Sequence, residues 1–117
     1  MTRIYKLLGK SEWDQALAEG ALHGTEQDRR DGYIHFSTAE QLQETARRYF
    51  ATHKDVVVIE VEDHTLGSAL KWEVSRGGAP FPHLFASLPV QSVLSARIFE
   101  PDPNPGPAPE KGPGDFA

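Results

Sequence analysis

His35 lies in a short segment, YIHF, whose residue types could build a binding or catalytic site. The β-branched and aromatic residues of this segment predict a strand. Alternation along the strand places Tyr33, His35 and Ser37 on one face. Ile34 and Phe36 fall on the opposite face and belong in the core. The polar face that carries His35 is therefore expected to look into solvent or into a cleft.

A helix is expected to begin directly after this strand. Ser37 and Glu40 have the spacing of a capping box, and Thr38 and Gln41 have it too. The free N–H groups and the positive dipole end of a helix N-terminus favour an anion. An imidazole, a hydroxyl and a helix N-terminus would therefore converge, which suits a phosphate or a ribose hydroxyl. The alternative is that Ser37 or Thr38 only caps the helix and that His35 is a half-buried strand residue bonded to backbone.

The second group of candidates lies in KWEVSRGGAPFPHLF. Glu73 alternates away from Trp72, so a buried Trp72 would turn Glu73 outward or into a cleft. A strand carboxylate opposite a histidine could hold a ribose or act as a base. The alternative for Glu73 is a solvated side chain paired with Lys71 or Arg76. His83 lies between aromatic residues on an ordered segment, and packing in the core is the alternative to a role in the site.

Several familiar signatures are absent from the sequence. It has no glycine-rich dinucleotide or phosphate loop, no nucleophile elbow and no His-Glu-x-x-His motif. The chain has no cysteine, which excludes disulfides and thiolate chemistry. The five histidines show no short paired spacing, so we name no metal ligand. A metal site assembled by folding is the alternative left open.

The surrounding elements predict an α+β domain with two main helices and five or six strands. RIYKLL, LKWEVS and VQSVLSARIF predict strands, and the continuous apolar run VVVIEV predicts a central strand covered on both faces. The first helix is expected over EWDQALAE, capped by Ser11 and ended by Gly20, and the intervening ALHGTEQDRRDG is expected to be turn-like. The predicted apolar faces carry Trp13, Ala16 and Leu17 on the first helix, Ala39, Leu42, Ala46, Tyr49 and Phe50 on the second, and Leu70, Trp72 and Val74 on the strand.

Length and charge bound the function further. The chain of 117 residues suits one domain, which we expect over residues 1–100, followed by a disordered proline- and glycine-rich tail over 101–117. No signal peptide or membrane-spanning stretch is evident, so the cytoplasm is expected. The net charge of −5 disfavours bulk nucleic-acid binding. The acidic body without an apolar surface stripe predicts a monomer.

Six segments carry a resemblance to a known family. WDQALAEG, DRRDGYIHFSTAEQ, RRYF, VVVIEV, LKWEV and FPHLF resemble, in this order, the domain-of-unknown-function family 952 of small bacterial proteins. The resemblance runs from about Ile4 to Val93. Some members are labelled glutathione S-transferase domain proteins, but no thioredoxin-like pattern supports that label here. The family is similar to the ADP-ribosyltransferase fold, near RNA 2′-phosphotransferases, with a split, mostly antiparallel pair of small sheets around an NAD cleft.

The resemblance implies NAD as the cofactor and a nucleotide as the ligand. His35 and Ser37 would match the pair that holds the ribose and nicotinamide side of NAD, and Glu73 would be the later strand carboxylate. Family members usually continue Phe-Pro-His-Leu-Tyr-Gly, whereas this chain has Phe85 and Ala86, so a tyrosine hydroxyl is missing. The implied catalytic residues are His35, Glu73 and His83, and the implied cofactor-binding residues are Tyr33, His35, Ser37, Thr38 and Phe85.

Three functions are therefore open. The first is an enzyme that binds NAD or a related nucleotide and transfers ADP-ribose or a phosphate-linked group. The second is a non-catalytic module that binds a nucleotide or another metabolite in the same cleft. The third is a protein-interaction domain with a vestigial cleft, because likeness of fold does not establish activity. A concave cluster of the candidate side chains would favour the first two functions.

Overall fold

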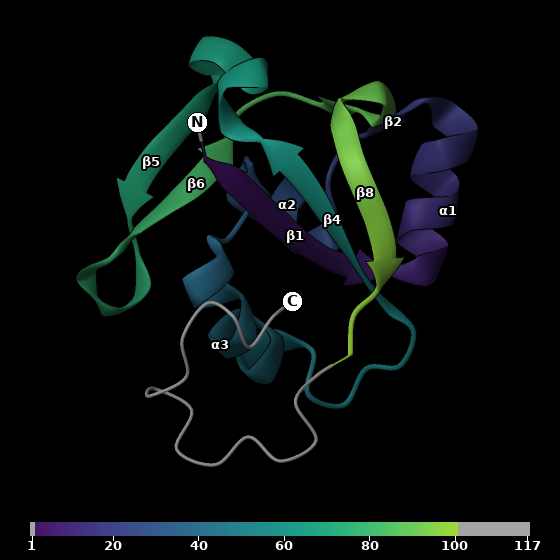
Figure 1. Cartoon of the computed structure of the whole chain (residues 1–117), viewed down its shortest axis with the longest axis horizontal. Helices are drawn as coiled ribbons and strands as arrows, with labels where there is room; N and C mark the ends of the chain where they lie inside the picture. The colour runs from purple at the N-terminus through teal and green to yellow at the C-terminus, as the bar shows by residue number, and fades with distance from the viewer. Residues whose placement is uncertain (1, 101–117) are drawn as a thin grey trace.

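The computed structural model describes residues 2–100, with the side chain of Arg76 excepted (Figure 1). The predicted tail over 101–117 lies outside the described residues. The described part is one α+β unit of small antiparallel sheets with three α-helices and three short 3-10 helices. Its main elements are β1 (Arg3–Gly9), α1 (Lys10–Glu19), β2 (Ala21–Leu22), α2 (Glu26–Asp31), β3 (Ile34–His35), α3 (Ala39–Tyr49), β4 (Val56–Glu62), β5 (Leu70–Val74), β6 (Pro80–Leu84), β7 (Leu88–Pro89) and β8 (Val93–Ile98).

The largest packing surface is the antiparallel sheet β1-β4-β8. Its central strand β4 is buried on both faces, as the run VVVIEV predicts. On one face Val57 and Ile59 join the larger core cluster, against which the partly buried Trp13 of α1 packs. On the other face Val58 packs with Leu42 of α3. Figure 1 shows α1 and α3 on different sides of this sheet.

A second sheet, β3-β6-β5, carries the two histidines of interest. His35 of β3 is the direct register partner of His83 of β6, so both side chains lie on one face of the sheet. The bridge between Tyr5 and Ser37 joins this sheet to β1, through the bonds from Tyr5 N to Ser37 O (2.8 Å) and from Ser37 N to Tyr5 O (2.7 Å). The strand that carries His35 is therefore tied to the main core on one side and to β6 on the other. A third, two-stranded sheet pairs β2 with β7.

The first helix begins differently from the prediction. The sequence predicts Ser11 as its cap, but the N-cap is Gly9, whose backbone N–H donates to the Glu12 carboxylate at 2.8 Å. A carboxylate three residues into the helix replaces the missing cap side chain here. The predicted end at Gly20 is confirmed by its left-handed conformation. Leu17, expected on the apolar face, is 51% exposed because the helix buries only Ala16.

The segment ALHGTEQDRRDG is not turn-like throughout, because it adds a short α-helix to the two main helices that the sequence predicts. It contains β2 and the helix α2, which Thr25 caps by accepting a hydrogen bond from Asp28 N at 3.2 Å. Asp28 returns the bond by accepting from Thr25 N at 2.9 Å. This reciprocal pair is a capping box with aspartate in place of glutamate. The segment is polar and shows no apolar helical periodicity, so α2 is not predicted from it. The capping hydrogen bonds stabilise this helix instead.

The predicted helix after the His35 strand is confirmed as α3, with Thr38 as its N-cap. Its buried face carries Leu42 and Ala46, whereas Tyr49 is exposed. The predicted apolar face of β5 is not buried beyond Leu70, because Trp72 is 41% and Val74 74% exposed. The β5–β6 hairpin extends past the core, as Figure 1 shows, so its outer end finds nothing to cover that face. In the described residues, no helix is long and apolar enough to span a membrane.

Candidate functional site

His35 and His83 converge on a cavity of about 170 Å³. Their ring centroids are 5.8 Å apart, with the rings edge to face. This closeness follows from the register of β3 and β6, which places the two residues directly opposite each other. The cavity wall includes Tyr5, Asp31, Tyr33, Ser37 and Tyr49 as well as both histidines.

Tyr33 forms an aromatic wall of the site. Its ring stacks on that of His83 with a centroid distance of 4.0 Å and an interplanar angle of 25°. The same ring lies 4.6 Å from His35 and 5.2 Å from Phe85, measured between centroids. Phe85 lines a neighbouring shallow hollow rather than the cavity itself. Tyr33 therefore offers a flat aromatic surface and a hydroxyl group between the two histidines and Phe85.

A buried carboxylate fixes the His35 ring. Nδ1 of His35 lies 2.6 Å from Oδ1 of Asp28, which also accepts the His35 backbone N–H at 3.1 Å. On the other side of the ring, Nε2 lies 3.0 Å from Oδ2 of Asp31. Both contacts are hydrogen bonds only when both ring nitrogens carry a proton, because carboxylates only accept. Asp28 thus sets the orientation of the His35 ring.

Lys6 completes this network in the wall of the cavity. The side chains of Lys6 and Asp28 are both buried, and their closest contact, from Nζ to Oδ2, is 2.9 Å. The Lys6 ammonium also donates to the His35 carbonyl oxygen at 3.0 Å. Burial alone would raise the pKa of Asp28, but the hydrogen bond from His35 and the nearby Lys6 charge outweigh it and hold that pKa well below its usual range. Asp28 is therefore held as an anion between the Lys6 ammonium and the His35 ring.

Sequence reasoning missed Asp28, Lys6 and Asp31. Asp28 could have been found from the spacing of Thr25 and Asp28, which is that of a capping box. Lys6 carried a signal as well, because alternation along β1 puts it on the face of Ile4, which is core. A lysine at a core position demands a buried carboxylate as its partner. Which carboxylate this is depends on the fold of α2.

The depressed pKa of Asp28 predicts a specific acid sensitivity. A carboxylate whose pKa is lower in the folded state stabilises the fold at pH values above its unfolded pKa of about 4. That stabilisation is lost as the pH falls below about 4, so the free energy of unfolding should fall more steeply there than in the variant Asp28→Asn. Denaturant unfolding at a series of pH values measures both slopes. Equal slopes for the two proteins would contradict the assigned network.

Glu73 orients the second histidine. Its Oε1 lies 2.7 Å from Nδ1 of His83, whose ring is buried. Glu73 therefore contacts a histidine, which the sequence offered beside the alternative of a solvated side chain. With Nδ1–H donating to Glu73, the neutral ring keeps Nε2 as its proton acceptor. Glu73 does not line the cavity itself and acts on it through His83.

Ser37 and Thr38 have different positions in the structure. Ser37 lines the cavity, but its hydroxyl is buried and lies 3.0 Å from that of Thr45. Thr38 caps α3 by exchanging bonds with Gln41, from Thr38 N to Oε1 at 3.0 Å and from Gln41 N to Oγ1 at 3.2 Å. Thr38 does not line the cavity. Side chains of the capping box therefore bond some of the free backbone N–H groups at the start of α3. This is the alternative in which Thr38 only caps the helix.

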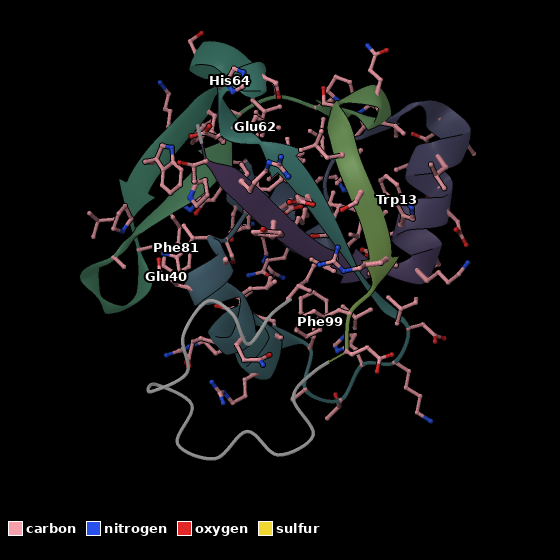
Figure 2. The ribbon with its side chains drawn as sticks, viewed as in Figure 1. Trp13, Glu40, Glu62, His64, Phe81 and Phe99 are labelled. Atoms are coloured by element: carbon pink, nitrogen blue, oxygen red, sulfur yellow. The ribbon has the colours of Figure 1, made fainter. Side chains whose placement is uncertain are left out.

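One group outside the cavity has metal-ligand chemistry. Ligand atoms of Glu62, Asp63 and His64 lie within 4.8 Å of one another, and Figure 2 shows Glu62 and His64 near the end of β4. Glu62 already accepts from Arg3 Nε at 3.0 Å, and Asp63 accepts from Thr2 N at 3.1 Å. Because both carboxylates have protein partners, we assign no metal to this group.

Comparisons with known proteins place the chain in a family. A family model described as a protein of unknown function (DUF952) matches residues 7–96. The crystal structure of protein CC0527 from Caulobacter crescentus superposes with a TM-score of 0.84 at 46% identity, over 87% of this chain and 90% of that one. The solution NMR structure of CC0527 gives a TM-score of 0.78 at 46% identity, over 89% and 90% of the two chains. No curated protein matches. The chain belongs to the domain-of-unknown-function family 952.

Proposed function

We propose that the chain is an enzyme that binds NAD, or a closely related nucleotide, in the cavity at His35 and His83. The reaction would transfer ADP-ribose or a phosphate-linked group to an acceptor. One observation carries this proposal: two imidazoles meet at one cavity, each with Nδ1 on a carboxylate, and Tyr33 is stacked on one of them. Paired, oriented imidazoles are suited to general acid and base catalysis.

The charges around the cavity favour a flat, cationic group. Asp28 and Asp31 contact His35, and Glu73 contacts His83. Lys6 is the compensating cation, and its ammonium is already bonded to Asp28. An isolated phosphate would meet this negative field, whereas the positively charged nicotinamide ring of NAD would be attracted by it. The face of Tyr33 adds a cation–π surface of the right shape.

The residues present fit the nicotinamide ring of that ligand and the ribose attached to it. Tyr33 would stack on the nicotinamide ring, and the His83 imidazole would bond a ribose hydroxyl through Nε2. His35 would bond a second hydroxyl through Nε2, in place of its contact with Asp31. Bound there, NAD would supply a ribose–nicotinamide bond that breaks with the electron pair leaving on nicotinamide. Glu73 would stabilise the positive charge that develops on the ribose, acting next to His83. An imidazole Nε2 would take the proton that the acceptor loses when it bonds to the ribose.

Replacing His35 by alanine tests this assignment by calorimetric titration with NAD. We expect NAD affinity to fall by at least about tenfold, because one charge-assisted hydrogen bond contributes roughly 1.5–3 kcal/mol. The matched control is His64→Ala, which removes an exposed histidine of the Glu62–His64 group. Its affinity should equal that of the unmodified protein. Equal affinities for all three proteins, or no binding by the unmodified chain, would overturn the proposal.

A second candidate is a module that binds the nucleotide without turning it over. Phe85 favours it, because its ring packs 5.2 Å from that of Tyr33 and offers no hydroxyl. The two candidates differ in one readout, the release of free nicotinamide from NAD. Release that depends on His83 supports the enzyme. Saturable binding with no release supports the module.

A further inference from the structure

A second and larger cavity lies apart from the two histidines. Its volume is about 650 Å³, within the range of sites for small molecules. It opens between the C-terminal half of α3, the loop from 51 to 55 and Phe99, and we call it the α3–Phe99 pocket. Figure 2 shows Phe99 just beyond the end of β8. The apolar residues that line it are Ala46, Phe50, Ala51, Val56 and Phe99.

The charged lining of this pocket is net positive. Arg47 and Lys54 line it against the single acidic residue Asp55, together with the polar Gln43 and His53. His53 and Lys54 form no ion pair with any residue that the structure describes. Within residues 2–100, Arg47 pairs with Glu44, at 3.4 Å and in an exposed setting. The chain as a whole is acidic, with a net charge of −5, whereas the rim of this pocket is positive. The local positive charge favours an anionic ligand.

The loop at the rim is held in an uncommon conformation. Asp55 has φ +56°, the one non-glycine residue with positive φ in the described part of the chain. Its carbonyl oxygen accepts the Lys10 N–H at 3.0 Å, which ties the loop to the start of α1. The rim that carries His53 and Lys54 is therefore fixed to the fold at its end. Such backbone strain is characteristic of ligand sites.

We propose that the α3–Phe99 pocket binds an amphipathic small molecule with an apolar body and one carboxylate head. The body would cover Phe50, Val56 and Phe99, and the head would meet Arg47 and Lys54. Arginine and lysine both bond carboxylates, and burial of the body removes apolar surface from water. This inference does not depend on the nucleotide proposal. The two sites are neighbours, however, because Phe50 lines both cavities.

The test is an amide chemical-shift titration of the full chain with decanoate as the probe. Two arginines of the last turn of α3 provide a matched pair of variants. Both contact Glu44, at 3.4 Å for Arg47 and at 3.0 Å for Arg48, but only Arg47 lines the pocket. Arg47→Glu and Arg48→Glu change the net charge equally. We expect Arg47→Glu to weaken decanoate binding about tenfold, which is about 1.4 kcal/mol, and Arg48→Glu to leave it within about twofold.

A third variant keeps the test decisive if charge reversal alters the fold. Ala51 is exposed at the pocket, so Ala51→Trp should fill it without disturbing the core and should abolish decanoate binding. Saturable shifts at 46–56 and at Phe99 that respond in this way support the proposal. No saturable shift, equal effects of the two arginine variants, or exclusion of decanoate by residues 101–117 bound in the pocket would overturn it.

Discussion

Replacing Asp28 by asparagine is expected to lower the free energy of unfolding by about 3–5 kcal/mol, the usual cost of removing one partner of a buried ion pair. Asp28 is 2% exposed and its carboxylate accepts from Lys6, from the backbone N–H and Nδ1 of His35, and from Thr25 N. Asparagine retains one carbonyl oxygen and adds N–H donors, so the Lys6 ammonium would stay buried without an opposing charge. A loss of this size is a large fraction of the stability of a small domain, and thermal or denaturant unfolding measures it.

The Lys6→Met variant supplies the control for this effect. Removing the ammonium as well as the carboxylate eliminates the unpaired buried charge, so the double variant Lys6→Met, Asp28→Asn should be more stable than Asp28→Asn alone. If the loss of unfolding free energy in the double variant equalled the sum of the losses in the two single variants, Lys6 and Asp28 would not be energetically coupled. The same double variant should still lose NAD affinity, because His35 would no longer have a carboxylate on Nδ1.

Glu73→Gln is expected to separate binding from chemistry. Glutamine can still accept a hydrogen bond from Nδ1 of His83, so the imidazole keeps its place. The negative charge that would stabilise the developing charge on the ribose is lost. Nicotinamide release should therefore fall by on the order of 10²–10³-fold, while NAD affinity changes much less. Single-turnover measurement of nicotinamide, beside a calorimetric titration, reports both quantities.

Glu62→Gln is the matched control, since Glu62 is also a partly buried carboxylate in an ion pair but lies at the end of β4. Its rate of nicotinamide release should equal that of the unmodified protein. If Glu73→Gln instead weakened binding and left the rate constant unchanged, Glu73 would be a binding residue only. That outcome would remove the catalytic role assigned to it.

Local periodicity was enough to predict most of the elements around the site. The alternation in YIHF placed Tyr33 and His35 on one face, and their rings lie 4.6 Å apart. The capping box at Thr38 and Gln41 located the start of α3. The apolar run of β4 identified the central strand, because a strand covered on both faces has no polar alternation.

The network beneath the site could not be predicted because it joins segments distant in the sequence. Lys6 and Asp28 come from β1 and α2, and only the tertiary fold brings their charges together. The exposure of Trp72 could not be predicted for the same reason. Alternation correctly placed Trp72 on the face of Leu70, but this face stays exposed because the β5–β6 hairpin extends beyond the core. Periodicity reports the face of a strand and not what packs against it.

The most direct test of the central claim is an amide chemical-shift titration of the full chain with NAD and, separately, with reduced NAD. The account predicts saturable shifts centred on Tyr33, His35 and His83 with NAD. Reduced NAD should bind more weakly, because its nicotinamide ring is neutral and gains nothing from Asp31 and Glu73. Shifts that are absent at millimolar NAD, or that fall away from the His35–His83 cavity, would contradict a nucleotide site between the two histidines.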